Sequence, residues 1–297
     1  MGYDAMTIGN HDYDWGQIIL ADRISAATFP FLSANIVTGD PDGWTPPAGV
    51  VPYIIKSVGF TEKAKVAIIG VTTQETAVLN AHLTVGLTFK DPAEAIIHYY
   101  NDMAAEADVI VVLSHLGFND GGYGIGEDVY GDKTLAQKLI NAGKPADLIL
   151  GGHSHTNMTA ATKVGDTTIA QAYYNGRRVG RADVTALPGG TVSVIWNSLT
   201  IDTTVSVDPA IDTLVNGFAT DPSYLALINQ SVGYTNVPVM RNYNGDSLMG
   251  SFICDAVYND LNSDDETGND VDLVLNNPGS ERADLIYGSY PHAISYG

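Results

Sequence analysis

Two short, strongly apolar segments, each preceded by a helical pattern, constrain the fold of this chain more than any other feature. Residues 108–113 read Asp-Val-Ile-Val-Val-Leu, and residues 146–150 read Ala-Asp-Leu-Ile-Leu. A strand with one face in water alternates apolar and polar residues, whereas a continuous apolar strand is typical of a sheet buried on both faces. The sequence therefore predicts an α/β fold built on a buried sheet.

Capping residues and apolar runs locate the other elements. Asp91 is suited to cap a helix, with Pro92 in the first turn and Glu94 at the third position, so a helix is expected to about Ala105. A second helix is expected over residues 133–141. Strands are expected at residues 29–35, 65–71 and 271–275, β segments between 167 and 202, and further helices over 209–228 and 247–261.

The order of these elements divides the chain into three parts. Residues 1–203 are predicted to form an α/β domain, residues 204–235 a helical connector, and residues 236–297 part of an α+β domain. The sequence contains no run of about twenty apolar residues, the length that a transmembrane helix needs. Residues 1–11 lack the basic region and apolar core of a signal peptide and resemble the middle of a strand–loop unit.

The charge of the chain argues against one class of partner. It carries 34 Asp and Glu residues against 14 Lys and Arg, which gives a formal net charge of −20. Proteins that bind nucleic acids or anionic membranes through a basic surface neutralise phosphates with Lys and Arg. We therefore expect no nucleic-acid partner.

Polar residues follow three of the predicted strands, where α/β proteins place ligand-binding loops. Residues 9–14 read Gly-Asn-His-Asp-Tyr-Asp, residues 114–117 Ser-His-Leu-Gly, and residues 151–156 Gly-Gly-His-Ser-His-Thr. Imidazoles combined with amide or carboxylate oxygens suit divalent metals such as zinc, manganese, iron or cobalt. One such histidine is more often a hydrogen-bonded structural residue, but three loops in this order favour a metal site.

The same segments resemble blocks of a known family. Residues 3–16, 114–115 and 152–155 are similar to blocks of calcineurin-like metallophosphoesterases, in the version found in bacterial 5'-nucleotidases and 2',3'-cyclic phosphodiesterases. Residues 246–256 and 277–284 resemble blocks of the 5'-nucleotidase C-terminal domain. The resemblance implies a two-sheet α/β/β/α sandwich, incomplete here, followed by part of an α+β nucleotide-binding domain. It also implies an extracytoplasmic parent protein, whether periplasmic, secreted or on the cell surface.

The resemblance further implies roles for the loop residues. The family binds two divalent metal ions and uses a metal-activated water to attack phosphorus. The implied metal ligands are Asn10, His115 and His153 for the second metal and His155 for the first. His11 is the implied catalytic histidine, and Asp14 would orient its imidazole. The alternative role for Asp14 is that of a turn carboxylate.

Two family blocks are missing. No Asp-x-His precedes Asn10, and the Gly-Asp whose aspartate bridges the metals is absent, so this chain retains mainly the second metal site. The retained ligands are all neutral and would hold a dication more weakly than a site with carboxylates. The chain is therefore expected to be an impaired or inactive piece of an active parent protein, truncated at both ends.

In the second domain, Asn277 and Arg282 match the block that contacts substrate, while Ser280 and Glu281 depart from it. A surface ion pair is the alternative role for Arg282. The predicted function is hydrolysis of nucleotide phosphoesters. Two alternatives stay open: a family member acting on a sugar phosphate, a nucleotide-sugar or a sulfur ester, and a catalytically inactive remnant or binding module.

Overall fold

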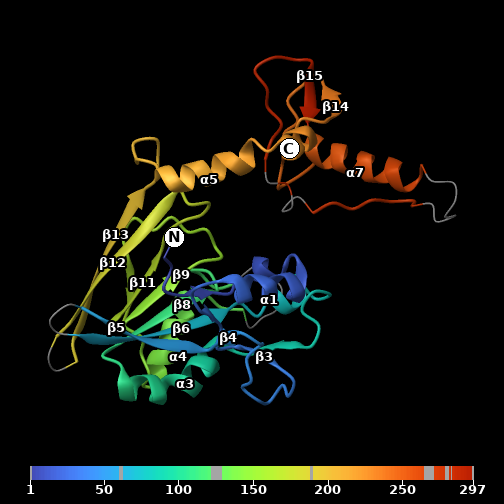
Figure 1. The fold of residues 1–297 in the computed structure, drawn as a ribbon. Helices are drawn as coiled ribbons and strands as arrows, with labels where there is room; N and C mark the ends of the chain where they lie inside the picture. The colour runs from blue at the N-terminus through green and yellow to red at the C-terminus, as the bar shows by residue number, and fades with distance from the viewer. Residues whose placement is uncertain are drawn as a thin grey trace. The chain divides into compact units, whose positions relative to one another are not determined.

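The computed structural model describes residues 2–59, 63–121, 129–187, 190–263, 271–277, 281 and 283–295. It divides the chain into two compact units, Met1–Val205 and Ser206–Gly297. Figure 1 shows the elements of both units along the chain. The predicted limits of the two domains and of the connector at residues 204–235 stay predictions.

The first unit is a mixed α/β structure built around a six-stranded central sheet. Its strands are β1 (Met6–Thr7), β2 (Phe31–Leu32), β3 (Ile36–Thr38), β4 (Val50–Val51), β5 (Tyr53–Val58), β6 (Ala64–Thr72), β7 (Leu87–Phe89), β8 (Val109–His115), β9 (Leu148–Gly151), β10 (Thr162–Val164), β11 (Thr167–Gln171), β12 (Arg178–Ala186) and β13 (Val192–Thr200). Its helices are the 3-10 helix η1 (Asn10–Tyr13), α1 (Gly16–Ala26), α2 (Thr76–Leu79), α3 (Pro92–Glu106) and α4 (Asp132–Asn141).

The central sheet has the strand order β10-β11-β9-β8-β6-β5. Strands β11, β9, β8 and β6 run parallel to one another, and antiparallel β10 and β5 form the two edges. Parallel neighbours end at the same side of a sheet. The register pairs Thr72 with His115 and Ser114 with Gly151, so the loops that follow β6, β8 and β9 begin side by side.

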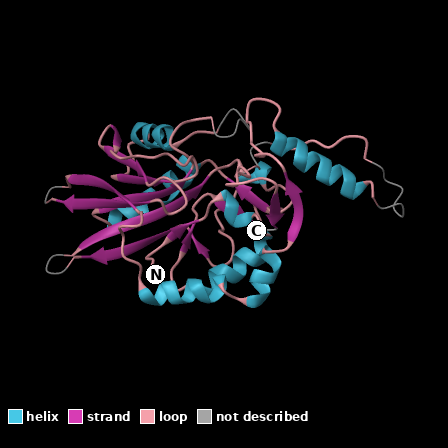
Figure 2. Ribbon diagram, turned by 90° about the horizontal axis from the view of Figure 1, so that it is seen from above, coloured by secondary structure: helices cyan, strands magenta, loops and turns pink. Residues whose placement is uncertain are grey.

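Both faces of the central sheet are covered, as the apolar runs predicted. Along β8, Ile110 and Val112 belong to the core under α3 and α4, whereas Val109 and Val111 pack against the β12–β13 hairpin. Successive strand residues point to opposite faces, so both sets of side chains must be apolar. Figure 2 distinguishes the helices and strands of the chain by colour. The predicted α/β sandwich is therefore confirmed, with a helical layer on one face and β structure on the other.

The helix predicted after Asp91 is confirmed as α3. The Asp91 side chain accepts a hydrogen bond from the backbone N–H of Glu94 at 2.9 Å, which satisfies one of the donors left open at a helix start. The strand predicted at residues 29–35 is shortened to β2, because Ser33 and Asn35 use their side chains to contact the end of β6. Asn35 donates to the carbonyl of Thr72 at 2.8 Å and accepts from its N–H at 2.8 Å.

A second, small parallel sheet of the unit has the strand order β1-β2-β4. Its core is made by Ile8, Tyr13, Leu20, Phe31, Ile36, Val50 and Phe89. The hydroxyl of Thr72 donates to the carbonyl of Ile8 at 2.6 Å. This bond ties the end of β1 to the end of β6, so the loop that starts at Gly9 lies beside the loops of the central sheet.

The second unit is smaller and contains α5 (Pro209–Ala219), α6 (Pro222–Ile228), β14 (Ser231–Thr235), α7 (Leu248–Leu261) and β15 (His292–Ser295). The single helix predicted over residues 209–228 is two helices, because Pro222 cannot continue a helix and Asp221 caps a new one by accepting from the N–H groups of Ser223 and Tyr224. The helix predicted at residues 247–261 is confirmed as α7, capped by Ser247.

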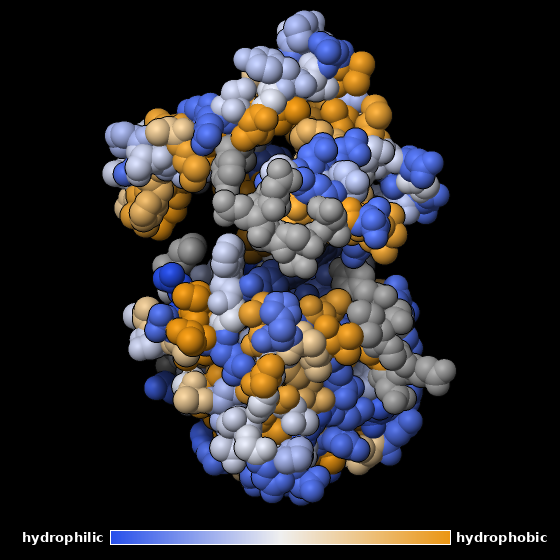
Figure 3. All heavy atoms as spheres, turned by 90° about the vertical axis from the view of Figure 1, so that its right-hand side faces the viewer, coloured by the Kyte–Doolittle hydropathy of each residue, from blue (hydrophilic) through white to orange (hydrophobic). Residues whose placement is uncertain are grey.

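The strand predicted at residues 271–275 was wrong, since this segment has no regular secondary structure. A strand needs a neighbour to bond its backbone, and in the described part of the unit β14 pairs with β15 instead. Leu273 and Leu275 are accordingly exposed. On the face drawn in Figure 3 hydrophobic and hydrophilic residues are mixed. Within the described residues, no helix is long and apolar enough to cross a membrane.

Candidate functional site

The three polar loops predicted from the sequence meet at the ends of β1, β8 and β9. η1 begins two residues after the end of β1. The Gly9 N–H donates to the Asp12 carboxylate at 2.7 Å, which fixes the start of this short helix. A Cβ built on Gly9 would lie 2.7–2.8 Å from ring atoms of His115. Only glycine therefore lets the first loop approach this close to the imidazole at the end of β8.

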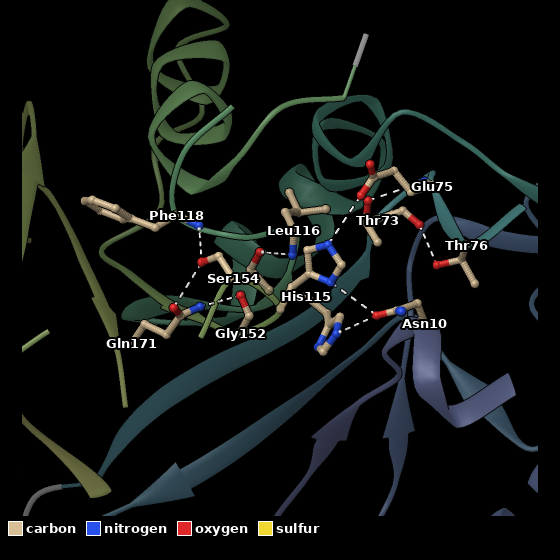
Figure 4. A network of polar contacts seen from close by, with 12 residues as sticks. Asn10, Thr73, Glu75, Thr76, His115, Leu116, Phe118, Gly152, Ser154 and Gln171 are labelled. Carbon is tan, nitrogen blue, oxygen red and sulfur yellow. Dashed lines mark hydrogen bonds and ion pairs between the residues drawn. The ribbon is translucent and has the colours of Figure 1, made fainter. Parts of the chain in front are cut away.

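An amide oxygen and two imidazoles form the centre of the site. The Oδ1 atom of Asn10 lies 3.0 Å from Nε2 of His115 and 3.2 Å from Nδ1 of His153. The two rings are 5.2 Å apart between centroids, at an angle of 61°. Figure 4 shows Asn10 and His115 pointing toward one another from different segments. The structure thus brings together the three residues that were predicted to share one metal.

Glu75 is a further member of this cluster that the sequence interpretation missed. Its side chain is fully buried, and its Oε2 atom lies 3.3 Å from Nε2 of His153. A carboxylate on the far nitrogen of a ligating histidine is the usual outer partner in metal sites, where it fixes the orientation of the ring. The position of Glu75 in the sequence could have indicated its role. It lies three residues after Thr72, the last residue of β6, and Thr72 pairs with His115, the last residue of β8.

Burial keeps both imidazoles of the centre neutral. Burial, reinforced by the neighbouring histidines, lowers the pKa of His115 to about 3. Burial also lowers the pKa of His153, although Glu75 acts in the opposite direction. Neutral imidazoles are the form that binds metals.

The donor set of the centre fits a divalent cation. A neutral His153 has one ring N–H but faces an oxygen at each nitrogen, Glu75 on one side and Asn10 on the other. If its proton lies toward Glu75, the lone pair on Nδ1 points at the amide oxygen, and a cation at that point would be held by both atoms. Within the described ranges, no three His, Cys, Asp or Glu side chains gather closely enough to form a metal site by themselves. The candidate centre therefore depends on the amide of Asn10.

His11 forms a separate, more exposed group beside this centre. Its Nδ1 atom lies 2.7 Å from Oδ2 of Asp14, and Asn80 donates to the other carboxylate oxygen at 3.1 Å. The His11 side chain is 62% exposed, so a substrate can reach it. A carboxylate held by a second residue restricts the orientation of the imidazole it contacts.

The remaining predicted site residues are not gathered at this centre. The ring of His155 stacks on Tyr174 with 5.1 Å between centroids. Asn277 belongs to the second unit, where it is exposed. Arg282 lies outside the residues that the structure describes. Their predicted roles stay predictions.

The known proteins that this chain resembles in sequence are 5'-nucleotidases and related nucleotide phosphoesterases. No family model matches the chain. The chain is 30% identical to the trifunctional nucleotide phosphoesterase protein YfkN of Bacillus subtilis, over 86% of this chain and 19% of that protein. It is also 30% identical to a snake venom 5'-nucleotidase of Naja atra, over 95% of this chain and 55% of that enzyme. The chain thus spans about half or less of the length of these relatives.

The fold agrees with these relatives. The crystal structure of a 5'-nucleotidase precursor from Thermus thermophilus superimposes with a TM-score of 0.67 at 24% identity, covering 88% of this chain and 52% of that one. At this identity the likeness establishes the fold alone.

Proposed function

Because the chain belongs to the family of 5'-nucleotidases and calcineurin-like phosphoesterases, we propose that it carries part of the catalytic centre of a metal-dependent hydrolase that removes phosphate from nucleotides. The observation that supports the proposal is the meeting of Asn10 Oδ1 with His115 Nε2 at 3.0 Å and with His153 Nδ1 at 3.2 Å. These atoms come from three loops far apart in the sequence, and each is a metal-ligand type.

In this proposal Asn10, His115 and His153 hold one divalent metal ion, and Glu75 orients the ring of His153. His155 serves a second metal ion. A cation bound there would activate a water and polarise the phosphoryl group. The ligands around the centre carry no charge of their own, because burial keeps both rings neutral. We therefore expect weaker metal binding than at a site with carboxylate ligands.

His11 would act on the substrate itself. Its exposed imidazole can stabilise charge on a phosphoryl oxygen or donate a proton to the leaving oxygen of the nucleotide. Asp14, 2.7 Å away, would keep that ring in one orientation. In the second unit, Asn277 and Arg282 would contact the nucleotide, a role supported by their match to the family block. An extracytoplasmic location is part of the proposal, supported by the venom relative.

Metal binding by the 297-residue chain is the first test of the proposal. We expect Co2+ to bind, and expect His153→Ala to weaken binding by about tenfold or more because it removes a ligand. His98→Ala is the matched control, since the ring of His98 stacks on Trp44 and belongs to no predicted site. Absence of Co2+ or Zn2+ binding, or equal loss in the two variants, contradicts the metal centre.

Hydrolysis of three substrates then tests the substrate class: AMP and ribose 5-phosphate, followed by release of phosphate, and a nucleotide-sugar diphosphate, followed by release of the nucleoside monophosphate. The assay is run with Mn2+ or Zn2+, with and without a chelator, and with His11→Ala. Release from AMP that is lost with the chelator and reduced in His11→Ala supports a nucleotidase. Release from the other esters but not from AMP refutes the nucleotide assignment while leaving the metal centre in place.

A further inference from the structure

The loop that carries His153 and His155 has a backbone that its residues disfavour. His153 has φ 70° and His155 has φ 52°, so two of three consecutive residues are in the left-handed region without being glycine. Residues with side chains adopt this region at a cost, and they stay there when their surroundings hold them. Some group outside the loop must therefore fix it.

The side chain of Gln171 makes contacts on both sides of the two histidines. Gln171 is the last residue of β11, is 2% exposed, and pairs through its backbone with Gly151. Its Nε2 donates to the carbonyl of Gly152, and its Oε1 accepts from the backbone N–H of Thr156. One amide thus bonds the residue before His153 and the residue after His155.

Ser154 extends this set of bonds to the loop after β8. Its hydroxyl donates to Oε1 of Gln171 at 3.1 Å and accepts from the Phe118 N–H at 3.0 Å. Figure 4 shows Gln171, Gly152, Ser154 and Phe118 joined in this way. Since the loop with Phe118 also follows His115, the bonds tie the two histidine-bearing loops together. In the described part of the chain, Gln171 is the side chain that bonds both Gly152 and Thr156.

We propose that Gln171 is a positioning residue that holds the Gly152–Thr156 loop in the conformation presenting His153 and His155 to bound metal. The inference rests on the proposed function, because it assigns a purpose to the placement of these imidazoles. Gln171 itself touches neither the Asn10 cluster nor a reacting atom. Its action is on the backbone at the two ends of the loop, through one donor and one acceptor.

The test compares three variants of the 297-residue chain. Gln171→Met keeps the volume of the side chain but removes both hydrogen-bonding groups, and Gln171→Glu keeps an acceptor for Thr156 while losing the donor to Gly152. Thr167→Val is the control, because Thr167 is as buried as Gln171 and lies at the other end of β11. This variant loses one hydrogen bond, from the Thr167 hydroxyl to the carbonyl of Ala146 at 2.6 Å.

Two readouts are taken, and the first does not need metal. Hydrogen exchange of the Thr156 amide in the metal-free chain is expected to be fast in Gln171→Met, slow in Thr167→Val and slow in Gln171→Glu. The second readout is the affinity for Co2+ alone, with its absorption spectrum. Loss of an outer partner typically lowers metal affinity by about 10-fold to 100-fold, and we expect that fall, with an altered spectrum, in Gln171→Met but not in the control.

The outcomes separate this inference from the proposed function. Wild-type protection of Thr156 in Gln171→Met refutes the positioning role, and so does wild-type Co2+ affinity in that variant. If the wild-type chain binds no Co2+, the metal centre is refuted, while the exchange of Thr156 still decides whether Gln171 holds the loop. Should Gln171→Met fail to unfold cooperatively, Gln171→Glu carries the test, since loss of its donor to Gly152 is expected to weaken Co2+ binding about tenfold.

Discussion

Replacing Gly9 by alanine should damage the candidate metal centre through one steric contact. Gly9 is buried, and its extended backbone, with φ −111° and ψ 175°, is open to any residue, so alanine adds no backbone strain. The new Cβ would lie 2.7 Å from Cε1 of His115, whereas ordinary contacts begin at 3.4 Å. The ring must therefore retreat by about 0.7 Å, or the loop must move away from it.

That displacement is large for a metal ligand and modest for the fold. Metal–ligand distances vary by about ±0.2 Å, so a shift of about 0.7 Å takes His115 out of coordination or forces the centre to rearrange. Overpacking a buried site costs roughly 1–3 kcal/mol. For a unit of this size that corresponds to a fall in melting temperature of roughly 2–12 °C. We expect Co2+ affinity to fall at least about tenfold.

Co2+ titration followed by absorption and thermal unfolding of the metal-free chain measure the two effects. Gly233→Ala is the control, because Gly233 has no atom within 4 Å of a built Cβ and no left-handed backbone. Wild-type affinity in Gly9→Ala would show that His115 does not act as a ligand from the position seen here. A fall in melting temperature without a fall in affinity leads to the same conclusion.

Three other substitutions test the surroundings of the site. Glu75→Gln removes the carboxylate from Nε2 of His153 and should lower Co2+ affinity about tenfold or more with little effect on unfolding; unchanged affinity would argue against an orienting role. Gly151→Ala places a Cβ 2.1 Å from the buried Oδ2 of Asp132 and should destabilise the chain by roughly 1–3 kcal/mol in urea unfolding, whereas a wild-type midpoint would contradict the packing. Asp91→Ala removes the cap of α3 and should cost about 1–2 kcal/mol at pH 7. Burial alone would raise the pKa of Asp91, but its hydrogen bonds outweigh burial and lower this pKa. The stabilisation by the Asp91 carboxylate is therefore present above the unfolded pKa of about 3.9 and is lost as the pH falls through the lower folded pKa. The difference in stability between wild type and variant should accordingly narrow as the pH falls below about 3.9.

Much of the first unit could be predicted because its signals are local. The bond from Glu94 to Asp91 joins residues three apart, and a cap of this kind is visible in the sequence. The apolar runs of β8 and β9 were equally visible, since burial on both faces favours apolar residues at successive positions of a strand. The strand predicted at residues 271–275 failed for the complementary reason: a strand is stable with a bonded neighbour, which no local pattern specifies.

The sequence by itself determined which ligand types the chain carries, and that they follow strands in a fixed order. The tertiary structure decided which of them meet. Asn10 and His115 are 105 residues apart, and Glu75 and His153 are 78 apart. Glu75 meets His153 because β6, β8 and β9 end side by side in the central sheet. Asn10 meets His115 because the Thr72 hydroxyl bonds Ile8 and so ties the end of β1 to the end of β6. The same packing placed Gln171 under the His153 loop and directed His155 onto Tyr174. The sequence gives the chemical type of each side chain. Which side chains become neighbours depends on how the whole core packs, because that packing brings together loops that are far apart in the sequence.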